Sequence, residues 1–457
     1  MSKPKHRTKK AVEQTVSQPV TQSVSPSGRR RFLLLGAGAL GAVGAGALAY
    51  QAGLFGGSTP APAVNPASSA AANFKLLPPV NLTADYANAL RAAEEITSHY
   101  ARELLTPWAL IHAVRGFGRD FTLSDGTKAV EHLCAKYAEE REVNGKRYVC
   151  FQRNAEVHEN SFLKTFLEAG VSPEQTIRVG ANQYTLREAG EHAKALFRCD
   201  PTDLARYDAK LLEEHLPWGL IALSTLVPPT PGTWTNAYGE KIDLHQVLER
   251  AFAAYEQMCS GLRNTLAQGE MESLEFRQAI NKHSCFGLHT VYGFFACYQH
   301  GYRRNDMPAR IRHLLDLTIY RMEGDAKALD READAAKAMG PEAIKRMAVS
   351  QEGKVVTSGS PPPQILEAMR LRSQIKLQGH ILEAINYGLL NKLFTLTPDQ
   401  QQRVKAGEQA LYESLVKLRA LNLDEFRRWH PKFVSDVVIA VGHAVRALKL
   451  LTPNNPG

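Results

Sequence analysis

The sequence predicts an all-α fold built from helical hairpins. From about Ala84 onward, apolar residues recur three and four positions apart, as in segment 162–167, a spacing that places them on one face of a helix. Strand-like stretches are few and short. The clearest is a hairpin over 142–148, with Asn144 and Gly145 as its two-residue turn. The third observation is that the helical segments resemble one another.

Internal similarity is clearest between segments 107–112 and 217–222, which read Pro-Trp-Ala-Leu-Ile-His and Pro-Trp-Gly-Leu-Ile-Ala. Each is followed by a glycine, Gly126 or Gly239, at which we expect a second helix to begin. A looser third unit contains Gly180 between two apolar segments. With further helices expected near 285–297, 375–390 and 437–450, similar helices begin at intervals of roughly 50 to 90 residues, as in stacked hairpins.

Six such hairpins can close into a ring. The repeat pattern over about residues 85–451 resembles the α/α toroid shared by terpenoid cyclases, protein prenyltransferase subunits and many polysaccharide-active enzymes. The resemblance lies in the repeat and matches no catalytic motif of these enzymes. It implies inner helices around a central lumen where polar side chains collect. An open helical solenoid explains the same periodicity and is the alternative fold.

Ahead of the helical domain, which we place at residues 81–452, composition divides the chain into three segments. We expect a disordered basic tail at 1–31, a signal sequence or single transmembrane helix at 32–55, and a flexible linker rich in Ala, Pro and Ser at 56–80. The tail holds eight Lys and Arg residues against Glu13 alone, so it carries +7 of the formal net charge of +9. The domain itself is nearly neutral, and we expect no nucleic-acid partner.

Residues 29–33, Arg-Arg-Arg-Phe-Leu, resemble the twin-arginine export signal, although Leu34 stands where that signal usually has Lys. The run that follows is uncharged and rich in Gly and Ala. Small-residue motifs at 61–63 and 70–72 would suit a signal peptidase. Cleavage would release a periplasmic protein. Without it, residues 32–55 would anchor the domain in a membrane, facing the periplasm or the exterior.

Two common cofactor motifs are excluded. Gly36, Gly38 and Gly41 match the glycine spacing of a dinucleotide-binding loop, but no acidic residue that could hold the ribose occurs between Glu13 and Asp85. The six cysteines lack the close paired spacing of zinc-binding motifs. The sequence therefore predicts no dinucleotide-binding residues and assigns no cofactor.

Four of the expected inner helices carry a histidine with a polar partner three residues later, on the same helix face. The pairs are His112 with Arg115, His289 with Tyr292, His380 with Glu383, and His443 with Arg446. Histidine can relay protons, Glu can act as a base, Tyr can donate or accept a proton, and Arg can stabilise a carboxylate. We therefore predict a lumen site formed by His289, Tyr292, His380, Glu383, His112 and Arg115, with His158 and His443 as further candidates.

Two other interpretations of these histidines stay open. They could be hydrogen-bonded residues that hold helices together, with Arg and Glu as salt-bridge partners. They could also bind a metal. His158-Glu159 lacks the second histidine of a zinc-peptidase motif, and His283 and His289 lie six positions apart, which suits one ion poorly. Ligands could still converge from different helices, as with His112, His289 and His380.

The leading functional expectation is an envelope protein that binds a saccharide or a protein partner through a polar lumen. The alternative is an extracytoplasmic enzyme, most concretely a polysaccharide lyase or hydrolase acting on a carboxylated sugar. Geometry separates the two. Side chains that point apart would exclude the enzyme, whereas side chains that converge in an open cavity would weaken the view that the protein only binds.

Replacing Arg29, Arg30 and Arg31 together with Lys should leave the precursor in the cytoplasm, because the twin-arginine route recognises arginine and not charge alone. Cell fractionation followed by immunoblotting measures the outcome. Unchanged export of the variant would point instead to the general secretory route or to simple membrane insertion.

Overall fold

The computed structural model describes residues 82–156, 158–198, 216–268, 284–340, 344 and 360–451. The basic tail, the apolar segment and the linker expected at 1–31, 32–55 and 56–80 lie outside these ranges. Within the described ranges, no helix combines the length and the apolar character that crossing a membrane requires.

The described chain is all-α, as the sequence predicted, and its strands form only small ribbons. The α-helices are α2 (Tyr86–Leu104), α3 (Pro107–Phe117), α4 (Ala129–Tyr137), α5 (Arg153–Glu156), α6 (Ser161–Glu168), α7 (Leu186–Leu196), α10 (Leu216–Leu226), α11 (Leu244–Met258), α12 (Ser260–Ala267), α14 (Leu288–Gln299), α15 (Met307–Met339), α17 (Ile365–Leu390), α18 (Pro398–Arg419), α19 (Leu423–Trp429) and α20 (Pro431–Lys449). One short 3₁₀ segment, η4 (Ser284–Gly287), directly precedes α14.

Local sequence sets several helix starts. At α3, the Thr106 side chain accepts a hydrogen bond from the N–H of Ala109, and Pro107 occupies the first helical position, where its missing N–H costs nothing. At α7, Thr185 and Glu188 bond each other's backbone N–H groups reciprocally. These caps fix where the helices begin before any long-range packing.

The strands form three antiparallel ribbons of two strands each: β1 (Ala138–Val143) with β2 (Lys146–Phe151), β3 (Thr176–Val179) with β4 (Asn182–Thr185), and β5 (Thr233–Thr235) with β6 (Lys241–Asp243). The first is the hairpin that the sequence predicted. Asn144 and Gly145 form its turn with φ of 50° and 74°, values that the asparagine-glycine pair tolerates well.

The expectation that Gly126 and Gly239 begin helices is wrong. Gly126 lies in a turn closed by the bridge between Thr122 and Lys128, and α4 begins after it. Gly239 lies between β5 and β6, and Gly180 lies in the same way between β3 and β4. All three glycines have positive φ, which suits a tight turn and not the first turn of a helix. The repeated unit is therefore a glycine turn followed by a helix.

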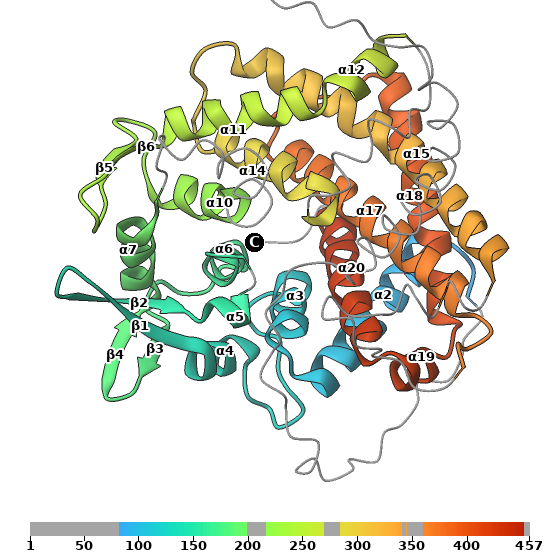
Figure 1. The fold of residues 1–457 in the computed structure, drawn as a ribbon, viewed down its shortest axis with the longest axis horizontal. Coiled ribbons are helices and arrows are strands. Elements are labelled where there is room, and N and C mark those ends of the chain that lie inside the picture. Colours follow the sequence, from blue (N-terminus) through green and yellow to red (C-terminus); the bar gives the residue numbers. More distant parts are fainter. Residues whose placement is uncertain are drawn as a thin grey trace, which may run out of the picture. The chain divides into compact units, whose positions relative to one another are not determined.

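Six helices that lie far apart in the sequence pack in succession. Helix α3 contacts α6, α6 contacts α10, α10 contacts α14, α14 contacts α17, and α17 contacts α20, which in turn packs against α3 (Figure 1). Four further helices pack against this set: α2 contacts α3, α7 contacts α10, α11 contacts α14, and α15 contacts α17. We call α3, α6, α10, α14, α17 and α20 the inner helices.

Glycines let α20 approach both of its inner neighbours closely. A Cβ atom added to Gly442 would lie 2.9 Å from Cβ of His112 on α3, and one added to Gly379 on α17 would lie 3.1 Å from the backbone N of Ala444. Larger residues at these positions would have to push the helices apart. The close packing brings the histidines of α3, α17 and α20 to one place.

Candidate functional site

The four predicted histidines meet. The rings of His380 and His443 stack with centroids 3.6 Å apart, and the ring of His112 lies 5.1 Å from that of His443. The ring of His289 lies 4.9 Å from His380 and 5.0 Å from His443. We call these residues, His112, His289, His380 and His443, the imidazole cluster. They come from α3, α14, α17 and α20, so four separate segments supply one site.

Hydrogen bonds fix how three of the rings are oriented. Nδ1 of His112 lies 2.6 Å from the carbonyl oxygen of Trp108, and Nδ1 of His380 lies 2.6 Å from that of Lys376. A carbonyl only accepts, so both Nδ1 atoms donate, and Nε2 carries the lone pair of each neutral ring. Nδ1 of His443 lies 2.6 Å from Oε2 of Glu383. The Nε2 atoms of His380 and His443 are buried and have no hydrogen-bond partner among the described residues.

Burial keeps the imidazole cluster neutral. It lowers the pKa of His112 to about 3, against which the bond to Trp108 raises it only in part. Burial also lowers the pKa values of His289, His380 and His443 far below the ordinary histidine value, and neighbouring rings and cations lower them further. At neutral pH the cluster therefore offers nitrogen lone pairs and no positive charge.

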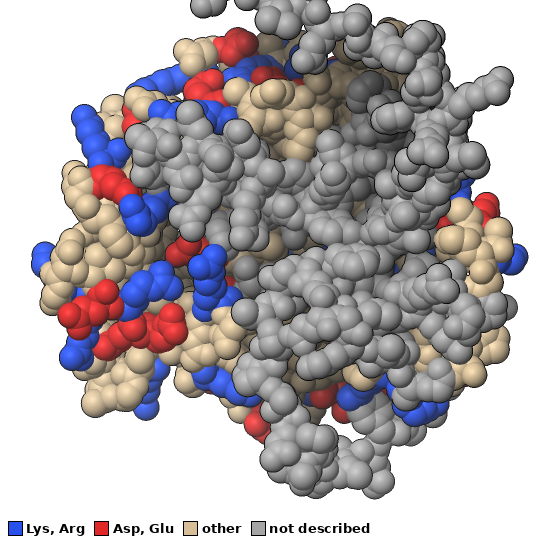
Figure 2. All heavy atoms as spheres, in the orientation of Figure 1, with Lys and Arg blue, Asp and Glu red and all other residues tan. Residues whose placement is uncertain are grey.

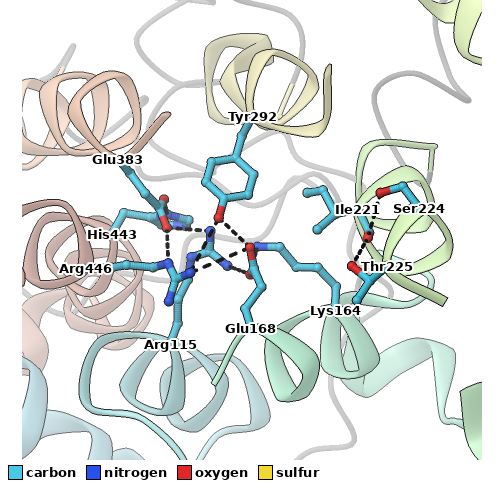
Figure 3. A network of polar contacts seen from close by, with 10 residues as sticks. All are labelled: Arg115, Lys164, Glu168, Ile221, Ser224, Thr225, Tyr292, Glu383, His443 and Arg446. Atoms are coloured by element: carbon cyan, nitrogen blue, oxygen red, sulfur yellow. Dashed lines mark hydrogen bonds and ion pairs between the residues drawn. The ribbon is translucent and has the colours of Figure 1, made fainter. Parts of the chain in front are cut away.

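A buried ion network contacts the imidazole cluster through His443 (Figure 3). Arg115 stands between two carboxylates, because its Nη1 donates to Oε2 of Glu168 at 2.5 Å and its Nη2 lies 2.5 Å from Oε1 of Glu383. Arg446 approaches the same two groups, with Nε 3.1 Å from Glu383 and Nη2 3.8 Å from Glu168. Lys164 lies 3.0 Å from Glu168. Because Glu383 also contacts His443, the network and the cluster form one site.

Tyr292 joins the network through its hydroxyl group. The hydroxyl donates to Oε1 of Glu168 at 2.5 Å, and the guanidinium of Arg115 and the ammonium of Lys164 each lie 5.3 Å from the ring centroid. Burial raises the pKa of Tyr292 well above its ordinary value, so the phenol stays protonated. Burial would also raise the pKa of Glu168, but Arg115 and Lys164 outweigh it and hold that pKa below the ordinary range.

The ion network carries more positive than negative charge. Arg115, Lys164 and Arg446 supply three cations, and Glu168 and Glu383 supply two carboxylates. Burial, and after it the charge of Arg115, lowers the pKa of Lys164 to about 8. The Lys164 ammonium therefore stays mostly charged at neutral pH. Burying a charge without a partner is costly. A bound anion would offset that cost.

Sequence reasoning missed Lys164 and Glu168. They lie four positions apart in the apolar segment of α6, and both side chains are largely buried. The signal existed, because charged residues on an apolar helix face are the same pattern that singled out the histidine pairs. The predicted site was restricted to helices that carry a histidine, which excluded α6.

His158 takes a different place from the imidazole cluster. Its ring stacks on that of Trp218 of α10 with centroids 3.7 Å apart, and the ring of Trp218 also lies 4.4 Å from that of His289. Trp218, the tryptophan of the repeated segment 217–222, therefore links His158 to the cluster. His283 lies outside the described residues.

The turn before α14 departs from the helix expected near 285–297. Cys285 and Phe286 have φ of 53° and 59°, and Gly287 continues the left-handed conformation at 69°. This region costs energy for residues with a side chain, and such strain is often found at functional sites. Arg321 of α15, which is fully buried and pairs with Asp325 at 2.8 Å, donates to the carbonyl oxygen of Phe286 at 2.7 Å. This contact holds the turn against the imidazole cluster.

A cavity of about 120 Å³ lies apart from this site, between β1, β2, α5, α6 and α7. Glu156 lines it together with Arg141 and Glu159. The carboxylate of Glu156 accepts hydrogen bonds from the N–H groups of Phe162 and Asn160. Burial nevertheless raises its pKa to about 8.

Comparisons with protein-family profiles, with curated proteins and with solved structures find no match to this chain. The function is therefore argued from the site itself.

Replacing Glu168 with Gln should lower the free energy of unfolding by roughly 3–5 kcal/mol, because Arg115 and Lys164 lose their shared buried partner. Urea unfolding of the full chain measures the change. In the control Glu174→Gln, the lost partner is Arg187 in an exposed pair, and we expect a loss below about 1 kcal/mol. Equal losses in both variants would show that the network does not hold the fold.

Glu156 should make stability fall as the pH rises. Its pKa is about 8 in the folded protein and near 4.5 when exposed, so the folded state binds the extra proton between these values. The stabilisation is complete below pH 4.5 and is lost as pH rises toward 8, by up to about 1.4 kcal/mol per pH unit. Urea midpoints of Glu156→Gln and the unaltered chain from pH 5 to 9 test this. Parallel curves for the two proteins would contradict it.

Proposed function

We propose that residues 81–452 form a closed α/α toroid in the cell envelope that holds an acidic small ligand at its centre. The contact between α20 and α3 supports closure, because it joins the last inner helix to the first. An open solenoid would leave those two helices as separate ends. The residues brought together come from α3, α6, α14, α17 and α20, as a lumen site requires.

The observation that carries the ligand class is the excess positive charge of the buried ion network. Arg115 and Arg446 present planar guanidinium groups, whose paired N–H donors match the two oxygens of a carboxylate better than a lysine ammonium does. The imidazole cluster adds neutral acceptors that can bind sugar hydroxyls. These features together favour a carboxylated saccharide.

The envelope location rests on the N-terminal segments. The basic tail, the apolar segment and the linker would deliver the domain across the membrane, either anchored through residues 32–55 or released after cleavage. Nucleic acid does not enter the proposal. On the face in Figure 2, Lys and Arg are interspersed with Asp and Glu over the described surface, which gives no field of one sign for gripping phosphates.

A second candidate function is a lyase that acts on the same ligand class. The buried Nε2 atoms of His380 and His443 are unprotonated acceptors, and Tyr292 is a protonated donor in the ion network. A base of this kind could take the proton next to a sugar carboxylate while Arg115 neutralises that carboxylate. Hydrolysis is less well supported. It needs a protonated carboxylic acid, and the cations around Glu168 keep it ionised.

Uronic-acid oligosaccharides should raise the unfolding temperature of the full chain, whereas the neutral oligosaccharides of the same sugar series should not. Arg446→Gln should weaken binding roughly 10- to 100-fold, because one charge-assisted hydrogen bond is lost. The remaining network would then hold equal positive and negative charge, so the variant should fold. Calorimetric titration measures the affinity, with Arg187→Gln, which removes an exposed arginine, as the control.

Equal binding of acidic and neutral sugars, or binding of neither, would overturn the proposed ligand class. Product analysis separates the two functions. A new carbon–carbon double bond, seen as ultraviolet absorbance, would identify a lyase. New reducing ends without that absorbance would identify a hydrolase, and unchanged ligand would leave a binding protein.

A further inference from the structure

We propose that Cys285, His289 and His380 form a site for a transition-metal ion, best suited to Zn²⁺. One potential ligand atom from each of the three residues lies within 4.8 Å of the other two. They come from the left-handed turn, from α14 and from α17. The inference does not depend on the ion network proposed to bind the acidic ligand, but it takes His289 and His380 from the imidazole cluster. With Nε2 of His380 on the metal, Nε2 of His443 would remain as the proton acceptor.

The chemistry of this set selects the ion. One thiolate and two imidazoles are ligands that zinc prefers over magnesium or calcium, which favour oxygen. Tetrahedral zinc with these bond lengths would hold the ligand atoms roughly 3.3–3.8 Å apart. The spacing of up to 4.8 Å therefore requires only small side-chain rotations to close around an ion. Three protein ligands would leave one coordination position for water or a substrate group, as in catalytic zinc sites.

His380 is already oriented as a metal ligand. Its Nδ1–H donates to the carbonyl oxygen of Lys376, so the lone pair that remains lies on Nε2, and that atom is buried without a hydrogen-bond partner among the described residues. A hydrogen bond from the other ring nitrogen to a carbonyl is the usual way in which proteins orient a metal-binding histidine. An ion would satisfy an atom whose burial is otherwise uncompensated.

Cys285 reaches the histidines from a strained turn and not from a continuation of α14. If the helical conformation of α14 extended back through Cys285, this residue would lie four positions from His289 on one helix. Instead the chain adopts positive φ at Cys285 and Phe286, and the buried side chain of Arg321 holds that conformation through the carbonyl oxygen of Phe286. A metal bond to Sγ would supply stabilisation that offsets the strain.

The metal site would also connect to the rest of the candidate site. The ring of His443 stacks on that of His380 and contacts Glu383 of the ion network. A ligand at the open coordination position could therefore reach the arginines with a carboxylate. This would place a Lewis acid beside the groups proposed to bind and to accept protons.

The first test uses the unaltered full chain. It should bind about one equivalent of Zn²⁺ that survives dialysis against a weak chelator. With Co²⁺ instead, it should show the near-ultraviolet charge-transfer band of a thiolate ligand. Binding below about a tenth of an equivalent, or ion binding without the thiolate band, would overturn the assignment.

Variants then locate the site. Cys285→Ser and His380→Gln should each weaken Zn²⁺ binding by more than roughly 10- to 100-fold, which is the effect of removing a residue that only hydrogen-bonds to a ligand. Two control variants should bind as the unaltered chain does: Cys297→Ser, on α14 with His289, and His112→Gln, in the imidazole cluster but outside the proposed ligand set. Equal losses in these controls would refute the ligand set.

Two further variants separate a failed site from a failed fold. Cys285→Asp keeps a metal-binding side chain, so it should retain Zn²⁺ but lose the cobalt–thiolate band, and a retained band would exclude Cys285 as the ligand. Arg446→Gln should bind the acidic saccharide more weakly and keep the metal. Loss of the metal in this variant would show that the ion network, and not Cys285, His289 and His380, controls the ion.

Discussion

The position of Arg115 between two buried carboxylates is the interaction on which the rest of the site depends. Arg115 on α3 reaches Glu168 on α6 and Glu383 on α17, so one guanidinium connects three helices that lie far apart in the sequence. Buried ions tolerate few arrangements, because each must keep its partners. A rotation of any of the three helices would separate Arg115 from one of its two carboxylates and leave a buried charge unpaired. The main contribution of the ion network is therefore the specificity of the helix arrangement.

The imidazole cluster follows from that constraint. Glu383 accepts a hydrogen bond from His443, and the ring of His443 stacks on that of His380. The orientation of α17 and α20 that lets Glu383 pair with Arg115 therefore also positions these two rings. Close packing at Gly442 allows His112 to join from α3. The rings stay neutral because they are buried, and their lone pairs are what a proton, a sugar hydroxyl or a metal ion would use. The packing of the imidazole cluster and its available lone pairs thus both follow from the same arrangement of helices.

Several elements could be predicted because their causes are local. The hairpin at Asn144 and Gly145 follows from the turn preference of that pair, and the helices follow from apolar spacing and from caps such as Thr106. The histidine pairs could be identified from the sequence because polar side chains on an apolar helix face are unusual and must find polar partners when buried. The glycine turns before α4 and α11 were mistaken for helix starts, since a glycine that precedes a helix looks the same in either role.

The amino-acid sequence by itself determined the all-α class, most helix positions and the four histidine pairs, because spacing along one helix decides which side chains share a face. Only the tertiary structure decided which faces meet. In the folded chain, Lys164 and Glu168 belong to the ion network, and Cys285 lies beside His289 and His380. The chain also forms a left-handed turn before α14. These features depend on partners such as Arg321, which lie far away in the sequence, and no local pattern encodes a contact of that kind.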